Sequence, residues 1–215
     1  MTLTPLPAAS VAYPSIGFIG RKRAGKDAAA AYLCDTLGYE QLAFADPLRD
    51  IAERINPIID KSPTEGCIRY RDAVDYYGYD AAKQAYREVR RFLQVLGTDA
   101  IREVLGQDVW VDYLAQRIHE LDDRTEAQGQ PLRPLVVTDV RFVNEVETLR
   151  SLGFMLVRIV RPQTHDGAAD PHPSETTLEG FPTDVTVWND SSLPVLHATL
   201  HELVATHHTA QEGAA

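Results

Sequence analysis

The sequence lacks most features of secreted, membrane-spanning or metal-clustered proteins. It has two cysteines in 215 residues, Cys34 and Cys67, too few for a disulfide framework and not at metal-ligand spacing. No apolar run approaches the roughly 18 residues of a membrane span. Residues 1–14 contain no basic stretch followed by an apolar core, so they do not read as a secretory signal. We therefore expect a cytoplasmic protein with no membrane partner.

Positive charge is also scarce. Lysine and arginine number 21 against 31 acidic residues, which gives a formal net charge of −10. Proteins that bind duplex nucleic acid usually present a basic face, so this balance argues against a nucleic-acid partner and favours a small anionic ligand. The length fits one domain, with room for inserted lobes.

The most informative segment runs from residue 20 to residue 27. It follows the apolar run 16–19, precedes an alanine-rich helical pattern, and has the Gly-x-x-x-x-Gly-Lys spacing of a phosphate-binding loop. Such a loop points successive backbone N–H groups inward, and the following helix adds its positive end. An ordinary glycine-containing turn is the alternative, but the three cations inside the loop disfavour it. The predicted ligand contacts are Gly20, Arg21, Lys22, Arg23, Ala24, Gly25, Lys26, Asp27 and Ala28.

One position departs from the pattern. Lys26 is usually followed by Ser or Thr, whose hydroxyl binds Mg²⁺, but here Asp27 and Ala28 follow. Asp27 could hold the metal through a water molecule, or pair with Arg21 or Arg23.

Apolar runs separated by Gly, Pro and Asp predict short strands that alternate with helices. The predicted strands are 16–19, 39–45, 135–139, 154–160 and 184–188. The predicted helices are 26–37, 47–56 (with Asp46 as N-cap), 81–96 (closed by Gly97), 98–106, 109–121, 144–152 and 193–206, while 60–78 shows no regular pattern. This alternation predicts a five-stranded parallel sheet covered by helices on both faces.

Polar residues follow several of these strands. In parallel sheets the ligand lies at the carboxyl ends of the strands, where 20–27, 44–49, 139–141, Arg161 and Asn189 would meet. Asp139 ends an apolar strand, as the metal-side acid of a Walker B strand does; a helix N-cap is the alternative. Arg141 could contact a phosphate or form a surface ion pair with Glu145.

Further arginines suggest an acceptor site and a mobile cover. Arg158 and Arg161 flank the loop to Pro182, which suits a lid, with a plain surface excursion as the alternative. Arg91 and Gln94 lie within about one helical turn, where a guanidinium could fork onto a monophosphate and an amide could read a base; a solvated helix face is the alternative. His165, His172 and His197 have no metal spacing and are expected to be solvent-exposed.

Taken in order, these motifs resemble a known family, the phage deoxynucleoside monophosphate kinases of the P-loop nucleoside monophosphate kinase group. The resemblance spans 16 to about 200. It rests on 20–27, 44–49, 91–94, 97–99, Arg102, Trp110, 138–142, 144–145, 161–162, 174–175 and Asn189.

The resemblance implies an α/β fold with a three-layer P-loop NTPase core, at about 14–46 and 108–215. It also implies a helical substrate-binding lobe at about 47–107 and a lid at about 161–183. The implied reaction is transfer of the ATP γ-phosphoryl group to a deoxynucleoside monophosphate, with Mg²⁺, in a protein compatible with a homodimer.

The resemblance also assigns roles to individual residues. The catalytic set is Lys26, Arg141, Arg158 and Arg161, the metal set is Asp27 and Asp139, and Asn189 joins the loop near the adenine. The acceptor set is Phe44, Arg49, Arg91, Gln94, Asp139, Arg141 and Glu175.

Two alternatives stay open. Dephospho-coenzyme A kinases and phosphomevalonate kinases resemble this loop and the last strand, although Gln94 and the lobe tyrosines (Tyr70, Tyr76, Tyr77 and Tyr79) favour an acceptor that carries a base. The second alternative is a nucleotide-binding module without transfer activity. It is suggested by the absence of a Ser or Thr hydroxyl after Lys26.

Overall fold

A computed structural model describes residues 13–62, 66–162 and 177–212, with side chains through residue 207. Contacts divide the chain into two compact units. The first, Met1–Ala43 with Leu114–Ala215, is called the core unit here, and the second, Phe44–Tyr113, is called the lobe. The segment 47–107, predicted as a substrate lobe, falls inside the second unit.

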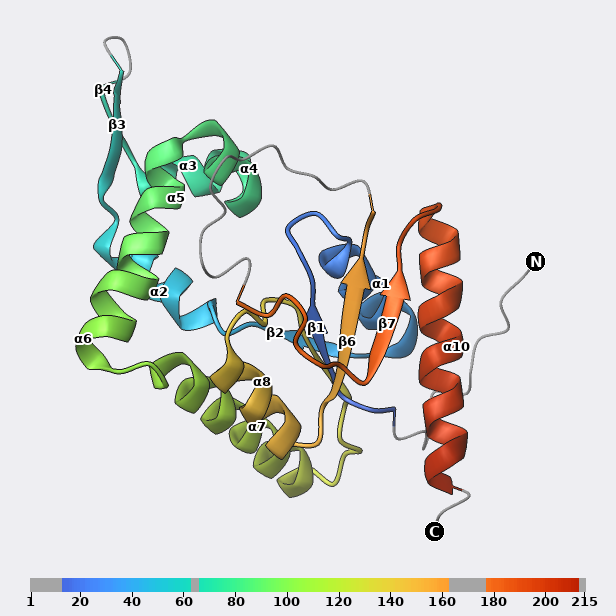
Figure 1. Cartoon of the computed structure of the whole chain (residues 1–215). Helices are drawn as coiled ribbons and strands as arrows, with labels where there is room; N and C mark the ends of the chain where they lie inside the picture. The colour runs from blue at the N-terminus through green and yellow to red at the C-terminus, as the bar shows by residue number, and fades with distance from the viewer. Residues whose placement is uncertain (1–12, 63–65, 163–176, 213–215) are drawn as a thin grey trace. The chain divides into compact units, whose positions relative to one another are not determined.

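The core unit is built on a five-stranded sheet in the order β2-β5-β1-β6-β7 (Figure 1). All four strand pairings are parallel. The strands are β1 (Ile16–Ile19), β2 (Glu40–Leu42), β5 (Leu135–Val137), β6 (Met155–Val160) and β7 (Val185–Trp188). The predicted sheet is therefore confirmed, with strand ends that differ by a few residues.

Helices cover both faces of this sheet. Ile16 and Phe18 pack into an apolar cluster with residues of α1 (Lys26–Leu37) and α10 (Leu193–Glu212). Gly17 between them points the other way, because side chains alternate along a strand. A Cβ at Gly17 would lie 2.8 Å from Leu149 Cδ1 of α8 (Val143–Ser151), so glycine lets that helix approach closely. The result is the predicted three-layer α/β arrangement.

The lobe has its own apolar core. It contains α2 (Asp46–Ile55), the antiparallel pair β3 (Ile58–Ser62) and β4 (Gly66–Arg69), α3 (Tyr70–Tyr77), α4 (Tyr79–Ala85), α5 (Arg87–Gln94), the π-helix η1 (Val95–Arg102) and α6 (Glu103–Leu105). The core residues are Ala52, Ile59, Tyr70, Ala73, Ala82, Val89 and Leu93. The chain then passes back into the core unit within α7 (Val109–Ala127).

The sequence predictions are least accurate in the lobe. The segment 60–78, predicted as irregular, forms part of the hairpin and α3. Its strands are mostly exposed and contain a register shift, so no alternating apolar pattern marks them. The predicted helix 81–96 is interrupted at Tyr86, which has extended backbone angles of φ −122° and ψ 109°. Helix α7 also continues to Ala127, six residues past its predicted end at 121.

Gly97 does not end a helix, as the sequence predicted. It lies inside η1, which runs without a break into α6, so the separate helix capped by Thr98 is also wrong. A Cβ at Gly97 would meet Leu48 Cδ2 at 2.9 Å, and the Gly97 carbonyl accepts a hydrogen bond from Trp110 Nε1 at 3.1 Å. Glycine is therefore required at this position by close packing against Leu48, and not by a turn in the backbone.

No helix in the described ranges is both long and apolar enough to cross a membrane.

Candidate active site

The loop between β1 and α1 is fitted closely to the two neighbouring strand ends. A Cβ at Gly20 would lie 2.4 Å from the Ile159 carbonyl oxygen of β6. Gly25 has φ +107°, and a Cβ there would lie 2.4 Å from Asn189 Nδ2. Any side chain would therefore collide with backbone or with a buried amide. Both glycines of the predicted phosphate-binding loop are required by packing as well as by conformation.

Lys26 folds back over this loop. Its Nζ donates to the Gly20 carbonyl at 2.6 Å and to the Arg21 carbonyl at 3.0 Å. Arg23 has a positive φ of 62°, and Ala24 N donates to Arg21 O at 3.2 Å, so the loop is a tight turn. Because α1 begins at Lys26, the positive end of the helix dipole and the ammonium lie at the same place.

Asn189 holds the loop in place. It follows β7, is 8% exposed, and donates through Nδ2 to the Ala24 carbonyl at 2.8 Å. Its own backbone N donates to Val160 O at 2.7 Å, which extends the β6–β7 ladder. Sequence reasoning assigned Asn189 to the adenine and did not anticipate this contact, which joins residues 165 apart. The adenine contact stays a prediction.

The turn after β5 is organised by Glu145. Its Oε2 accepts hydrogen bonds from Arg141 N at 2.6 Å and Phe142 N at 3.0 Å, and the residue is 2% exposed. Phe142 occupies the N-cap position of α8, so Asp139 does not, and the alternative of a capping role for Asp139 is excluded. The Glu145 carboxylate thus accepts a hydrogen bond from the backbone of Arg141, and residue Arg141 is exposed.

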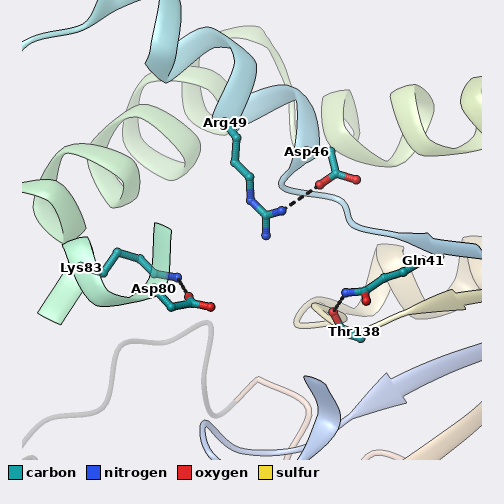
Figure 2. A network of polar contacts seen from close by, with 6 residues as sticks. All are labelled: Gln41, Asp46, Arg49, Asp80, Lys83 and Thr138. Carbon is teal, nitrogen blue, oxygen red and sulfur yellow. Dashed lines mark hydrogen bonds and ion pairs between the residues drawn. The ribbon is translucent and has the colours of Figure 1, made fainter. Parts of the chain in front are cut away.

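Thr138 precedes this turn and is buried. Its hydroxyl Oγ1 accepts a hydrogen bond from Gln41 Nε2 of β2 at 3.4 Å (Figure 2). This contact links the middle of β2 to the residue that follows the neighbouring strand β5. Asp139, next in the chain, is half-buried at the same edge of the sheet.

Arg158 supports a second turn. Its Nη2 donates to the Leu178 carbonyl at 3.0 Å and to the Phe181 carbonyl at 2.6 Å. Burial lowers the pKa of this guanidinium, and the nearby Glu179 carboxylate partly offsets the change. The predicted catalytic arginine is thus in contact with backbone carbonyls of residues 178 and 181, and its part in catalysis stays a prediction.

Glu179 connects that turn to the phosphate loop. Its Oε1 lies 2.6 Å from Arg21 Nη2 and accepts a hydrogen bond from Arg21 Nε at 2.9 Å. The side chains are 55% and 46% exposed, so the pair is a surface contact. Sequence analysis did not identify Glu179, and no motif marks it.

The predicted lid can be described only at its ends. Arg161 follows β6 directly and is exposed. Glu175, His165 and His172 lie outside the described residues. His197 was predicted to be an ordinary exposed histidine, but it is half-buried and stacks on Tyr32 with ring centroids 4.3 Å apart.

The acceptor residues predicted in the lobe do not share one set of contacts. Arg49, in the first turn of α2, lies 3.1 Å from Asp46 Oδ1 (Figure 2). Asp46 is therefore an ion-pair partner inside α2, whose N-cap position is Ala45, and the predicted N-cap role is wrong. Phe44 is 3% exposed and belongs to the buried interior.

Arg91 lies against another part of the lobe. It pairs with Glu88 at 3.1 Å and lines a cavity of about 240 Å³ with Phe92, Val95 and 57–59. Residues 57–59 follow the last turn of α2, whereas Arg49 is in its first turn, about 9 Å along the helix axis from the last residue, Ile55. Gln94, on the same helix α5, is exposed.

The parallel sheet, the glycine loop closed by Lys26 after the central strand, and the acid after β5 define a P-loop nucleotide-binding protein. The family model described as deoxynucleotide monophosphate kinase matches residues 53–200. The chain belongs to the deoxynucleotide monophosphate kinase family, and the resemblance found in the sequence is confirmed.

Individual relatives agree with this assignment. A protein of Acanthamoeba polyphaga mimivirus, provisionally named a deoxynucleotide monophosphate kinase, is 28% identical over 86% of this chain and 93% of its own length. The deoxynucleotide monophosphate kinase of Escherichia phage RB69 is 29% identical over 70% of this chain, which spans 59% of the phage protein. The deoxynucleoside-5'-monophosphate kinase of Escherichia phage T5 is 34% identical over 41% of this chain and 34% of the phage protein.

Solved structures give a weaker likeness. A dephospho-CoA kinase from Campylobacter jejuni has a TM-score of 0.45 at 10% identity, covering 92% of this chain and 98% of that one. A gluconokinase from Sinorhizobium meliloti 1021 has a TM-score of 0.42 at 14% identity, covering 92% and 97%. Likenesses of this size carry no argument about the substrate.

Proposed function

We propose that this chain transfers the γ-phosphoryl group of ATP to a deoxynucleoside monophosphate, giving ADP and a deoxynucleoside diphosphate. The observation that carries the proposal is the family match over 53–200, joined to a phosphate-binding loop whose glycines admit no side chain. Phosphoryl transfer depends on alignment and charge stabilisation more than on covalent chemistry, so the loop and its cations are the parts the reaction needs.

On the donor side, Lys26 exchanges partners. Its ammonium donates to two neutral loop carbonyls, Gly20 O and Arg21 O. Phosphate oxygens accept stronger, charge-assisted hydrogen bonds, so a bound triphosphate draws the ammonium away from them. The loop N–H groups and the first turn of α1 add to the same field.

Two carboxylates suit Mg²⁺, which binds oxygen ligands and is held by one or two carboxylates together with phosphates and water. Asp139, half-buried after β5, and Asp27, exposed in the first turn of α1, are oxygen donors of this kind. We propose that they hold the ion directly or through water. When bound, the ion neutralises charge on the phosphates.

On the acceptor side, arginines replace a general base. The acceptor phosphate is already anionic, so it needs positioning and charge compensation rather than strong deprotonation. We assign Arg49 to the acceptor, and Arg141 and Arg161 to the transferred group. Both of these arginines are exposed: Arg141 lies in the turn after β5, and Arg161 directly follows β6. The predicted roles of Arg158, Arg91, Gln94 and Asn189 are kept as part of the proposal.

A coupled assay of ADP release tests the proposal. The acceptor panel contains the four deoxynucleoside monophosphates, their ribose counterparts and dephospho-coenzyme A. We expect turnover with at least one deoxynucleoside monophosphate. Turnover with dephospho-coenzyme A alone, or ATP binding without ADP release for any acceptor at saturating Mg²⁺, contradicts the proposal.

A further inference from the structure

In the lobe, one aromatic ring contacts two cations. Arg49 Cζ lies 4.6 Å from the centroid of the Tyr79 ring, and Lys83 Nζ lies 4.1 Å from it. Both distances are within the range at which the ring quadrupole attracts a cation. The two charges come from different helices, α2 and α4, and are brought together by tertiary structure.

Each cation has an acid three residues before it. Arg49 pairs with Asp46 at 3.1 Å and Lys83 pairs with Asp80 at 2.6 Å (Figure 2). The Lys83 side chain is 29% exposed and that of Asp80 is 80% exposed, so the ammonium lies inward on the ring and the carboxylate faces solvent. Solvent screening makes such a pair weak, so the acid compensates only part of the charge.

The ring itself is held firmly. Tyr79 is half-buried against the apolar core of the lobe, next to Tyr70, which is 1% exposed. The pKa of Tyr70 is raised to about 12, first by burial and then by Tyr79 and Glu53, while Arg49 acts in the opposite direction. The Arg49 guanidinium therefore acts electrostatically on the Tyr70 hydroxyl as well as contacting the Tyr79 ring, with its side chain 42% exposed.

We propose that Arg49, Tyr79 and Lys83 form the site for the phosphate of the acceptor, here called the cation platform. This inference rests on the proposed function and names two residues, Tyr79 and Lys83, that the sequence motifs did not assign to this role. Asp46 and Asp80 each pair with only one of the two cations, whereas the oxygens of one dianionic phosphate monoester can accept charge-assisted hydrogen bonds from both. Arg91 lines the cavity formed with residues 57–59 and is not part of this platform.

Calorimetric titration with each of the four deoxynucleoside monophosphates tests the platform without requiring turnover. We expect Lys83→Met to weaken binding of the preferred nucleotide about tenfold or more, the usual effect of losing a charge-assisted contact. Lys61→Met, the same change at an exposed lysine of β3 in the same unit, is the matched control and should bind as the wild type does. Tyr79→Phe should retain affinity, because the ring remains, whereas Tyr79→Leu should lose it.

The steady-state constants separate a binding role from damage to the fold. Loss of Lys83 should raise the KM for the acceptor and leave the KM for ATP unchanged, and Arg49→Met should weaken acceptor binding more than Arg91→Met. Equal affinity of Lys83→Met and Lys61→Met, or a parallel rise in both KM values, overturns the inference. If the wild type turns over a deoxynucleoside monophosphate and Lys83→Met binds it with unchanged affinity, the platform is rejected and the proposed function stands. If the wild type is inactive on every deoxynucleoside monophosphate, the proposed function is rejected. In that case the calorimetric titration alone tests the platform.

Discussion

The phosphate loop of the core unit and the cation platform of the lobe present charge in different ways. The loop is made of backbone, and Gly20 and Gly25 fit against Ile159 O and Asn189 with no room for a Cβ. The platform is made of long side chains from α2 and α4 gathered on one ring. A site built from backbone tolerates almost no substitution at its glycines, whereas a site built from side chains should lose its function in steps.

The largest effect should follow from Lys26→Ala. Removal of the ammonium that we propose binds the terminal phosphates should lower kcat/KM by on the order of a thousandfold, with an unchanged melting temperature. Lys61→Ala in the lobe serves as the control. An unaltered kcat/KM would show that Lys26 and its loop do not take part in the reaction, and would contradict their proposed role in binding phosphate.

Gly25→Ala should test the backbone side of the comparison. A Cβ there collides with the Asn189 amide at a φ of +107°, so we expect a loss of about 1–3 kcal/mol in the free energy of unfolding, and loss of ATP binding. Gly38→Ala is the matched control, because φ is +73° there but a Cβ would have no described neighbour within 4 Å. Its cost should be about 1 kcal/mol, with ATP binding retained. Equal effects in urea unfolding would mean that conformation alone, not packing, requires Gly25.

Asn189→Ala should have an intermediate effect. The variant leaves the buried Ala24 carbonyl without its amide donor, which should cost about 1–3 kcal/mol in unfolding free energy. Because the loop then loses its brace, the KM for ATP should rise while the KM for the acceptor stays constant. A change in the KM for the acceptor alone would contradict a role of Asn189 in supporting the loop that binds ATP.

Glu179→Gln should have the smallest effect. Its ion pair with Arg21 is half-exposed, so solvent screening should keep the change in stability within about 1 kcal/mol. The KM for ATP should change by less than about threefold, and the difference from wild type should shrink at 0.5 M salt. A large loss of activity would show that side chains at the loop matter as much as its backbone does.

The parts of the fold that follow from local pattern were predictable. The glycine spacing of the loop, helix 26–37 and the five strands of the parallel sheet each depend on contiguous residues, and the structure agrees with these predictions to within a few residues. Other features depend on partners far away in the chain. The Asn189 amide and the Ala24 carbonyl are 165 residues apart in the sequence. Gly97 was predicted to end a helix, because its close packing against Leu48 cannot be recognised from the sequence.

The lobe was harder for the same reason. Its hairpin β3–β4 is mostly exposed and carries no alternating pattern. Lys83 has the spacing of an ordinary surface pair with Asp80, and only the folded structure places it on Tyr79 beside Arg49. Arg49 and Arg91 looked like one acceptor set in the sequence, but their neighbours lie at opposite ends of α2.

The hydrogen bonds that Arg158 donates to the carbonyls of Leu178 and Phe181 have an evolutionary consequence. Strand β6 carries Arg158 near its end and leads directly into the connection that returns at these carbonyls, so both ends of that connection are fixed to one strand. Since the entropic cost of closing a loop grows only slowly with its length, a connection anchored in this way can be lengthened, shortened or exchanged without loosening the sheet. Descendants of this chain could therefore diversify at this position while the rest of the enzyme is inherited intact.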